Sequence, residues 1–230
     1  MIRTVTIQVI KILALFSVVI FSVLMLKTIF QYTAFEKNTG FLAFKQQVIG
    51  NRYWITCFYI HIFSILLCFL AGLTQFSNRF LAENKKLHRI IGKIYIYNIL
   101  IINVPVCFIL GLFSNGGLIG IAGFLTQDVL WAYFTIIAVL SIKKGDTIKH
   151  KNYMMLSYAV TTTAITFRII KNLFYNEGRY HYDLFYGINV WLALGINLLI
   201  AYLVLKRNMK HPSLALKKNM RQENKQCNIQ

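Results

Sequence analysis

Four polar residues interrupt long apolar stretches of this 230-residue sequence, and their types could do chemistry there: His61, Asn103, Asp128 and Arg168. Polar side chains are costly in an apolar environment, so each of them requires a partner. A carboxylate and a guanidinium can form an ion pair, and a histidine can exchange a proton near neutral pH. Two interpretations follow. One is a structural bridge that fixes the packing of neighbouring elements, and the other is a site for a small molecule, a quinone or a proton.

The histidines offer a second kind of chemistry. His88 and His150 each open an apolar stretch among lysines and arginines, and His61 lies within another stretch. The dipole at a helix N-terminus disfavours a cation, which favours the neutral imidazole that binds metal or haem iron. His88 and His150 could therefore ligate one haem b between two helices, with His61 as a further ligand. The alternative is that both histidines lie at a membrane interface, where they bind lipid headgroups or cap helices.

The elements that must position these residues are membrane-spanning helices. The chain is 57% hydrophobic and only 14% charged, whereas a soluble domain carries about 25% charged residues. Its net charge of +18 is spread over short segments between the apolar runs. This distribution argues against a nucleic-acid partner and favours the lipid bilayer with anionic headgroups at the cytoplasmic face. The four cysteines (Cys57, Cys68, Cys107 and Cys227) predict no disulfide framework.

The pattern predicts an all-α integral membrane protein, a single membrane domain built as a bundle of six transmembrane helices. The predicted spans are about 7–30, 53–76, 88–113, 118–142, 153–174 and 184–205, and a basic cytoplasmic tail follows at 206–230. Pro105 is predicted to kink the third span, because its ring removes one backbone donor. The segment 77–87 is predicted as a basic turn, and 114–117 as a tight turn.

The distribution of lysine and arginine predicts the orientation of the bundle. Sixteen of these residues fall on the side of the chain that holds the tail, and four fall on the opposite side. The positive-inside rule therefore places both termini in the cytoplasm. At the rise of an α-helix, His61, Asn103, Asp128 and Arg168 then all lie roughly 9–15 Å deep in the outer half of the bundle. We expect them to form one polar cluster, with Asp128 and Arg168 as its ion pair.

Several stretches of this chain are similar to a known family. They are 71–76 with His61, 88–95, 114–124 with Trp131, and 145–168, which runs from Gly145-Asp146 through His150 to Arg168. Together they resemble the bacterial membrane proteins grouped as domain of unknown function 2306. The likeness extends from about residue 53 to 168 and includes Trp191 and Asn197 of the last span. It departs from the family pattern at His150-Lys151, Tyr153-Met154 and Ala201-Tyr202. The resemblance implies a bacterial multi-span fold and no particular activity.

The sequence thus predicts a multi-pass protein of the bacterial inner membrane with a histidine-containing bundle core and an unassigned function. One alternative is a haem b-binding electron-transfer protein similar to cytochrome b561. Another is a small-molecule carrier or a membrane assembly factor, although no matched pair of broken helices is visible in the two halves. The sequence contains no phosphate-binding glycine loop and no H-E-x-x-H motif, so it favours a function other than catalysis.

Overall fold

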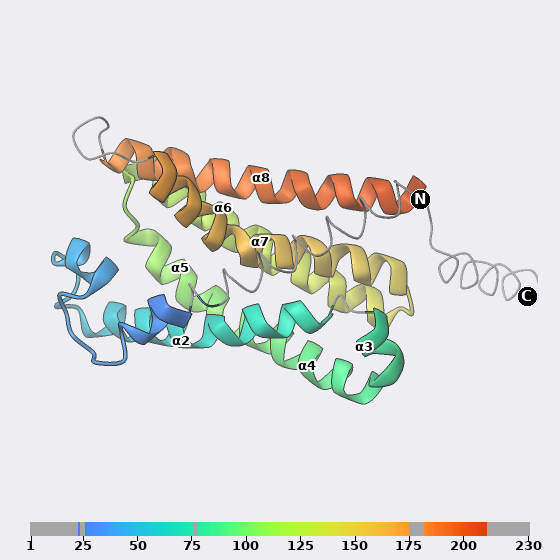
Figure 1. Ribbon diagram of the computed structural model, residues 1–230. Coiled ribbons are helices and arrows are strands. Elements are labelled where there is room, and N and C mark those ends of the chain that lie inside the picture. Colours follow the sequence, from blue (N-terminus) through green and yellow to red (C-terminus); the bar gives the residue numbers. More distant parts are fainter. Residues whose placement is uncertain (1–22, 24–25, 76–77, 175–181, 211–230) are drawn as a thin grey trace, which may run out of the picture.

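The described elements of the protein are all helices (Figure 1). The computed structural model describes residues 23, 26–75, 78–174 and 182–210. Its α-helices are α2 (Arg52–Gln75), α3 (Asn78–Glu83), α4 (Lys85–Tyr97), α5 (Val104–Leu112), α6 (Gly117–Lys143), α7 (Thr147–Phe174) and α8 (Tyr182–Lys210). A short 3-10 helix, η1 (Gly40–Lys45), precedes α2. A π-helix, η2 (Asn98–Asn103), joins α4 to α5.

The helices form two packed groups. α6, α7 and α8 pack against one another, and α2 packs against α4, η2 and α5. The two groups are joined where α5 packs on α6 and where α2 meets α7. At that second contact, a Cβ atom on Gly72 would lie 2.0 Å from the ring of Tyr158. Only glycine lets the two helices approach so closely.

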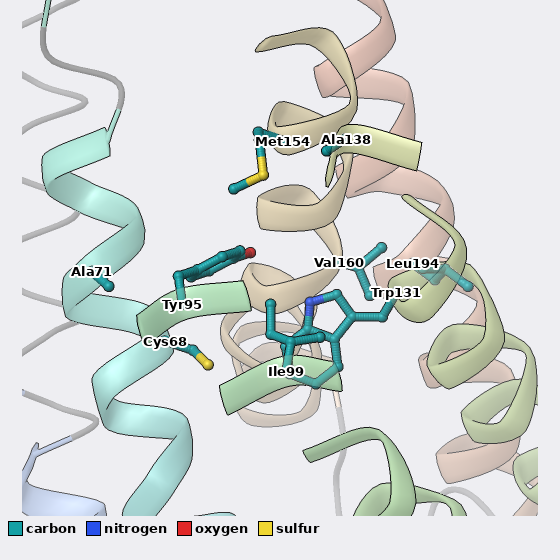
Figure 2. Packing of buried hydrophobic residues seen from close by; sticks show 9 residues of the cluster. All are labelled: Cys68, Ala71, Tyr95, Ile99, Trp131, Ala138, Met154, Val160 and Leu194. Carbon is teal, nitrogen blue, oxygen red and sulfur yellow. The ribbon is translucent and has the colours of Figure 1, made fainter. Parts of the chain in front are cut away.

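The core between the two groups is formed by side chains from α2, α4, η2, α6, α7 and α8 (Figure 2). Tyr95, Ile99 and Trp131 are among its buried members. Outside this core, large apolar side chains such as Leu192, Leu199 and Leu203 of α8 are at least half exposed. Such a surface suits lipid, and the helices satisfy their own backbone hydrogen bonds as a bilayer requires.

Four helical segments of the described chain are long and apolar enough to cross a membrane: Arg52–Gly72, Lys85–Leu112, Gly117–Lys143 and Tyr182–Arg207. They correspond to the second, third, fourth and sixth predicted spans. The fifth predicted span lies in α7, which is 28 residues long but too polar to meet the same criterion. Most of the first predicted span, 7–30, lies outside the described residues. The number of six spans and their orientation therefore remain predictions.

Two helix boundaries differ from the prediction for local reasons. The segment 77–87 was expected to be a turn, but it contains α3 and the start of α4. α7 begins at Thr147, six residues before the predicted span, because the side chain of Asp146 caps it: Oδ1 accepts a hydrogen bond from the Lys149 N–H at 2.8 Å. His150 consequently lies in the first turn of a helix and not at the mouth of a span.

The segment before α2, which contains η1, contacts the turn between α5 and α6 at one end of the bundle. Lys45 is buried, and its Nζ donates a hydrogen bond to the carbonyl oxygen of Phe113. Asp183 is nearby, and its Oδ1 accepts from the N–H of Gly116 at 3.3 Å. Burial lowers the pKa of Lys45 below its ordinary value, and the charge of Asp183 partly opposes this effect.

Candidate functional site

His61 lies on α2, half-buried, and faces the π-helix. Its Nδ1 is 2.9 Å from Oδ1 of Asn103. The same nitrogen is 3.2 Å from the Sγ of Cys107 on α5. The described part of the chain offers no hydrogen-bond partner to the other ring nitrogen, Nε2. One side of the imidazole is thus fixed by the protein, and the other side is available.

The π-helix explains why two asparagines meet at this point. Asn98 and Asn103 are five residues apart, and in an α-helix two side chains at this spacing would point about 140° apart around the helix axis. Within η2 they lie in line, and Nδ2 of Asn103 donates to Oδ1 of Asn98 at 2.8 Å and to its carbonyl oxygen at 3.1 Å. A π segment inside a helix is rare and often marks a functional site. The segment ends just before Pro105, where the sequence predicts an irregularity.

Ser64, one turn after His61, completes the network on α2. Nδ2 of Asn98 donates to the carbonyl oxygen of Ser64 at 2.7 Å. Nδ2 of Asn103 also lies 3.1 Å from the Ser64 hydroxyl. All of these polar groups therefore have partners, and together they fix His61 relative to η2. Satisfied buried networks of this kind make a site rigid.

Asp128 lies on α6, which packs against α5, the helix that carries Cys107. Only 4% of it is exposed, and its Oδ1 has no hydrogen-bond partner. Oε1 of the adjacent Gln127 is likewise buried without a partner. Asp128 and Cys107 lie within electrostatic range of each other, and Cys107 contacts His61. A carboxyl group in a span without a hydrogen-bond partner is costly, so Asp128 is a candidate functional residue.

Arg168 lies on α7, within electrostatic range of His61. Its NH1 donates to the carbonyl oxygen of Ala164 at 3.0 Å, one turn back on its own helix. Across the described residues no ion pair joins Arg168 to Asp128, which differs from the arrangement expected from their depths. The reason is geometric: the guanidinium follows its own helix and leaves several N–H groups for another acceptor.

Three aromatic side chains form a wall that joins α6, α7 and α8. It consists of Phe124, one turn before Asp128, Phe167, next to Arg168, and Tyr186 of α8. The ring centroids are 6.1 Å apart for Phe124 and Phe167, and 5.9 Å for Phe124 and Tyr186. Those of Phe167 and Tyr186 are 4.8 Å apart in an edge-to-face arrangement. Tyr186 is also within electrostatic range of Arg168.

The residue types at His61 suggest a Cys–His–Asn catalytic triad, but their geometry does not form one. In a triad the nucleophile and the orienting residue contact opposite nitrogens of the imidazole. Here Cys107 and Asn103 both contact Nδ1. The imidazole cannot relay a proton between them. The arrangement is suited to binding through Nε2 and not to activating the thiol.

His88 and His150 lie at the other end of the bundle. Nδ1 of His150 is 2.8 Å from the carbonyl oxygen of Ala138, which leaves its Nε2 available. Nδ1 of His88 is buried without a partner, and the two histidines are within electrostatic range. Among the described residues no group of three or more His, Cys, Asp or Glu could hold a metal ion. His181 lies outside the described residues.

A second polar network in the centre of the bundle was not predicted from the sequence; two of its members, Tyr95 and Trp131, are shown in Figure 2. The hydroxyl of Tyr95 lies 3.1 Å from that of Ser157 and 2.9 Å from that of Thr161. Nε1 of Trp131 donates to Thr161 at 3.0 Å, and the Thr135 hydroxyl lies 2.8 Å from that of Ser157. The four-residue spacings Trp131–Thr135 and Ser157–Thr161 were the available signal. Every donor here has a partner, so this network joins α4, α6 and α7.

The described chain is helical, with four segments long and apolar enough to cross a membrane and a polar network that joins His61 of α2 to Asn103 of η2. The chain belongs to a family described as predicted membrane protein (DUF2306), whose family model matches residues 58–205. This match confirms the resemblance seen in the sequence, and it includes His61, Asn103, Cys107, Asp128 and Arg168. Searches of curated proteins and of solved structures give no match to the chain.

Proposed function

We propose that this membrane protein binds a small, bilayer-soluble molecule at the edge of its core, between the half-buried His61, the buried Asp128 and the exposed Arg168. The observation that carries the proposal is Oδ1 of Asp128, which is buried without a hydrogen-bond partner. Buried polar groups in proteins nearly always have partners, so an orphaned carboxyl oxygen in a span is a strong indication of an absent one.

The surrounding geometry favours a ligand over a structural bridge. A bridge would satisfy Asp128 with Arg168, yet the guanidinium bonds to Ala164 on its own helix. Nε2 of His61 also has no partner in the described residues, although Nδ1 is held firmly. Three groups with unused hydrogen-bonding capacity thus come from α2, α6 and α7, next to the aromatic wall. This is the composition of a typical ligand site: apolar walls with a few placed polar groups.

Mass spectrometry of the purified protein tests this proposal. The protein is extracted in a mild detergent, washed, and then treated with organic solvent to release any bound compound. We expect a compound that is retained in near-stoichiometric amount by the wild-type protein and lost from Asp128→Leu. Ser141→Ala is the matched control, because Ser141 is equally buried on α6 but bonds only to Ile137 of its own helix. The proposal fails if no compound is retained and no bilayer-soluble compound in a thermal-shift panel stabilises the protein.

The same proposal places the protein in the bacterial inner membrane with both termini in the cytoplasm. The basic residues of the α3–α4 and α6–α7 connections support this orientation, and they are suited to contacts with anionic lipid headgroups. A fusion of alkaline phosphatase to the C-terminus should be inactive, and a fluorescent protein at the same place should be bright. Transport is distinguished from binding by loading the identified compound into proteoliposomes and measuring its release.

Haem b remains a second candidate because of one observation. Nδ1 of His150 is bonded to a backbone carbonyl, which is how proteins orient a histidine that ligates metal through Nε2. His88 would supply the opposite ligand, and the group would add electron transfer. The absorption spectrum of protein expressed with haem supplied tests this directly. A split reduced spectrum that is lost in His88→Ala and His150→Ala supports haem, whereas a spectrum without a Soret band excludes it.

A further inference from the structure

The hydrogen-bond network assigns the orientation of the Asn103 amide. Three acceptors surround its Nδ2: Oδ1 of Asn98 at 2.8 Å, the Asn98 carbonyl at 3.1 Å and the Ser64 hydroxyl at 3.1 Å. Asn98 is itself fixed, because its own Nδ2 donates to the Ser64 carbonyl at 2.7 Å. A reversed Asn103 would point its oxygen at two other oxygens. The amide oxygen of Asn103 therefore faces His61.

This orientation decides which nitrogen of His61 carries the proton. The Asn103 oxygen can only accept, so Nδ1 of His61 must be the N–H that donates to it at 2.9 Å. A neutral imidazole has one donor and one acceptor. Nε2 is consequently the acceptor, and its lone pair points away from η2 with no donor in the described residues to meet it.

The complementary ligand must therefore bring a hydrogen-bond donor to His61. It must also bring an acceptor to the remaining N–H groups of Arg168, and it must be apolar enough to lie against Phe124, Phe167 and Tyr186. A compound that carries only carbonyl oxygens meets the second and third conditions but not the first. A hydroxylated aromatic ring meets all three.

We propose that the site selects a bilayer-soluble compound with a ring hydroxyl, of the hydroquinone class, whose O–H donates to Nε2 of His61. A second ring oxygen faces the guanidinium of Arg168, and the ring lies beside the aromatic wall. This inference rests on the proposed ligand site, and it names the chemistry of its ligand. It predicts binding of the hydroxylated form and requires no electron transfer by the protein.

The first arm of the test measures the tautomer and needs no ligand. Nitrogen NMR of protein labelled with 15N-histidine distinguishes an Nδ1–H imidazole from an Nε2–H one. The His61 signal is assigned by its loss in His61→Asn, which keeps a polar atom near the Nδ1 position and removes the Nε2 group. We expect the Nδ1–H tautomer. An Nε2–H tautomer would overturn this inference and leave the proposed ligand site standing.

The second arm compares three matched probes by calorimetric titration under anaerobic, reducing or oxidising conditions: methylnaphthohydroquinone, the corresponding quinone, and the hydroquinone dimethyl ether. We expect the hydroquinone to bind about tenfold more tightly than either analogue, as one lost hydrogen bond would give. His61→Asn should abolish this preference, and His61→Gln, which returns an acceptor near the Nε2 position, should restore part of it. Equal binding of all three probes would overturn the hydroxyl selection alone. No binding of any probe, together with no retained compound, would overturn the ligand site as well.

Discussion

Nδ2 of Asn103 donates a hydrogen bond to Oδ1 of Asn98 at 2.8 Å, although the two residues are five positions apart on one continuous helix. This contact exists because η2 has π geometry, which turns both side chains toward α2. From it follow the orientation of the Asn103 amide, the position of the His61 proton and the direction of the free Nε2. The chemistry of the site thus depends on a local change in helical pitch.

Removing one residue from η2 should dismantle the site while leaving the bundle intact. Deletion of Ile101 lets the segment return to α-helical geometry, so Asn98 and Asn103 no longer lie in line. We expect a folded, less stable protein whose His61 NMR signal changes and which no longer retains its ligand. Ile101→Val is the control, because this side chain is 67% exposed. An unchanged His61 signal in the deletion variant would contradict the role given to η2.

Replacing Asn103 by leucine should destabilise the protein by about 1–3 kcal/mol, because it removes the donor to Oδ1 of Asn98 and leaves the His61 N–H with only the weak acceptor Sγ of Cys107. We expect the loss of stability to be small because hydrogen bonds between membrane helices contribute less free energy on average than hydrogen bonds in the cores of water-soluble proteins. Thermal unfolding in detergent measures the effect. Phe108→Leu, on an exposed position of the next helix, should change the midpoint much less. Equal shifts in the two variants would argue against a structural contribution of the network.

Tyr95→Phe should separate the central hydroxyl network from the ligand site. It removes the hydroxyl that joins Ser157 and Thr161, so we expect a loss of about 1–2 kcal/mol in stability. Ligand retention should remain, because Tyr95 makes none of the contacts of His61. Tyr97→Phe, at a position that is 58% exposed, controls for the loss of a hydroxyl. Loss of the ligand from folded Tyr95→Phe would show that the two networks act as one.

Lys45 should make stability increase with pH. Its pKa in the folded protein is below the ordinary 10.5, because burial disfavours the charged form. Between the lowered pKa and 10.5 the unfolded chain binds the proton and the folded chain does not, so the free energy of unfolding rises with pH across that window. Unfolding of the wild type and of Lys45→Met is compared from neutral pH to above 10.5.

The wild type should gain stability relative to Lys45→Met over this range. In Asp183→Asn the pKa of Lys45 should fall further, since the opposing charge is removed, and the window should begin at lower pH. If the wild type and Lys45→Met gave parallel profiles of stability against pH, the lowered pKa of Lys45 would be contradicted.

The sequence predicted the apolar helices well, because length and hydropathy decide them: α6 and α8 begin within two residues of the predicted spans. From the helical rise alone, the sequence predicted that His61 and Asn103 lie at a similar depth along their helices. It did not find the π geometry of η2, because an apolar run has the same composition in both kinds of helix. Cys107 had no predicted role beyond its place in a predicted span, and its contact with His61 depends on that change in pitch. The direction of the Arg168 side chain is likewise set by its own helix and not by its depth.

The close contact of Gly72 with Tyr158 sets the distance between α2 and α7, the helices that carry His61 and Arg168. Gly72 lies eleven residues beyond His61 on α2, about 16 Å along the axis, where α2 meets α7. His61 belongs to one helix group, and Asp128 and Arg168 belong to the other. The size of the side chain at position 72 therefore sets the separation of the two helix groups that carry the residues of the proposed site. A larger residue at this remote position would move His61 away from Asp128 and Arg168 without altering any of the three.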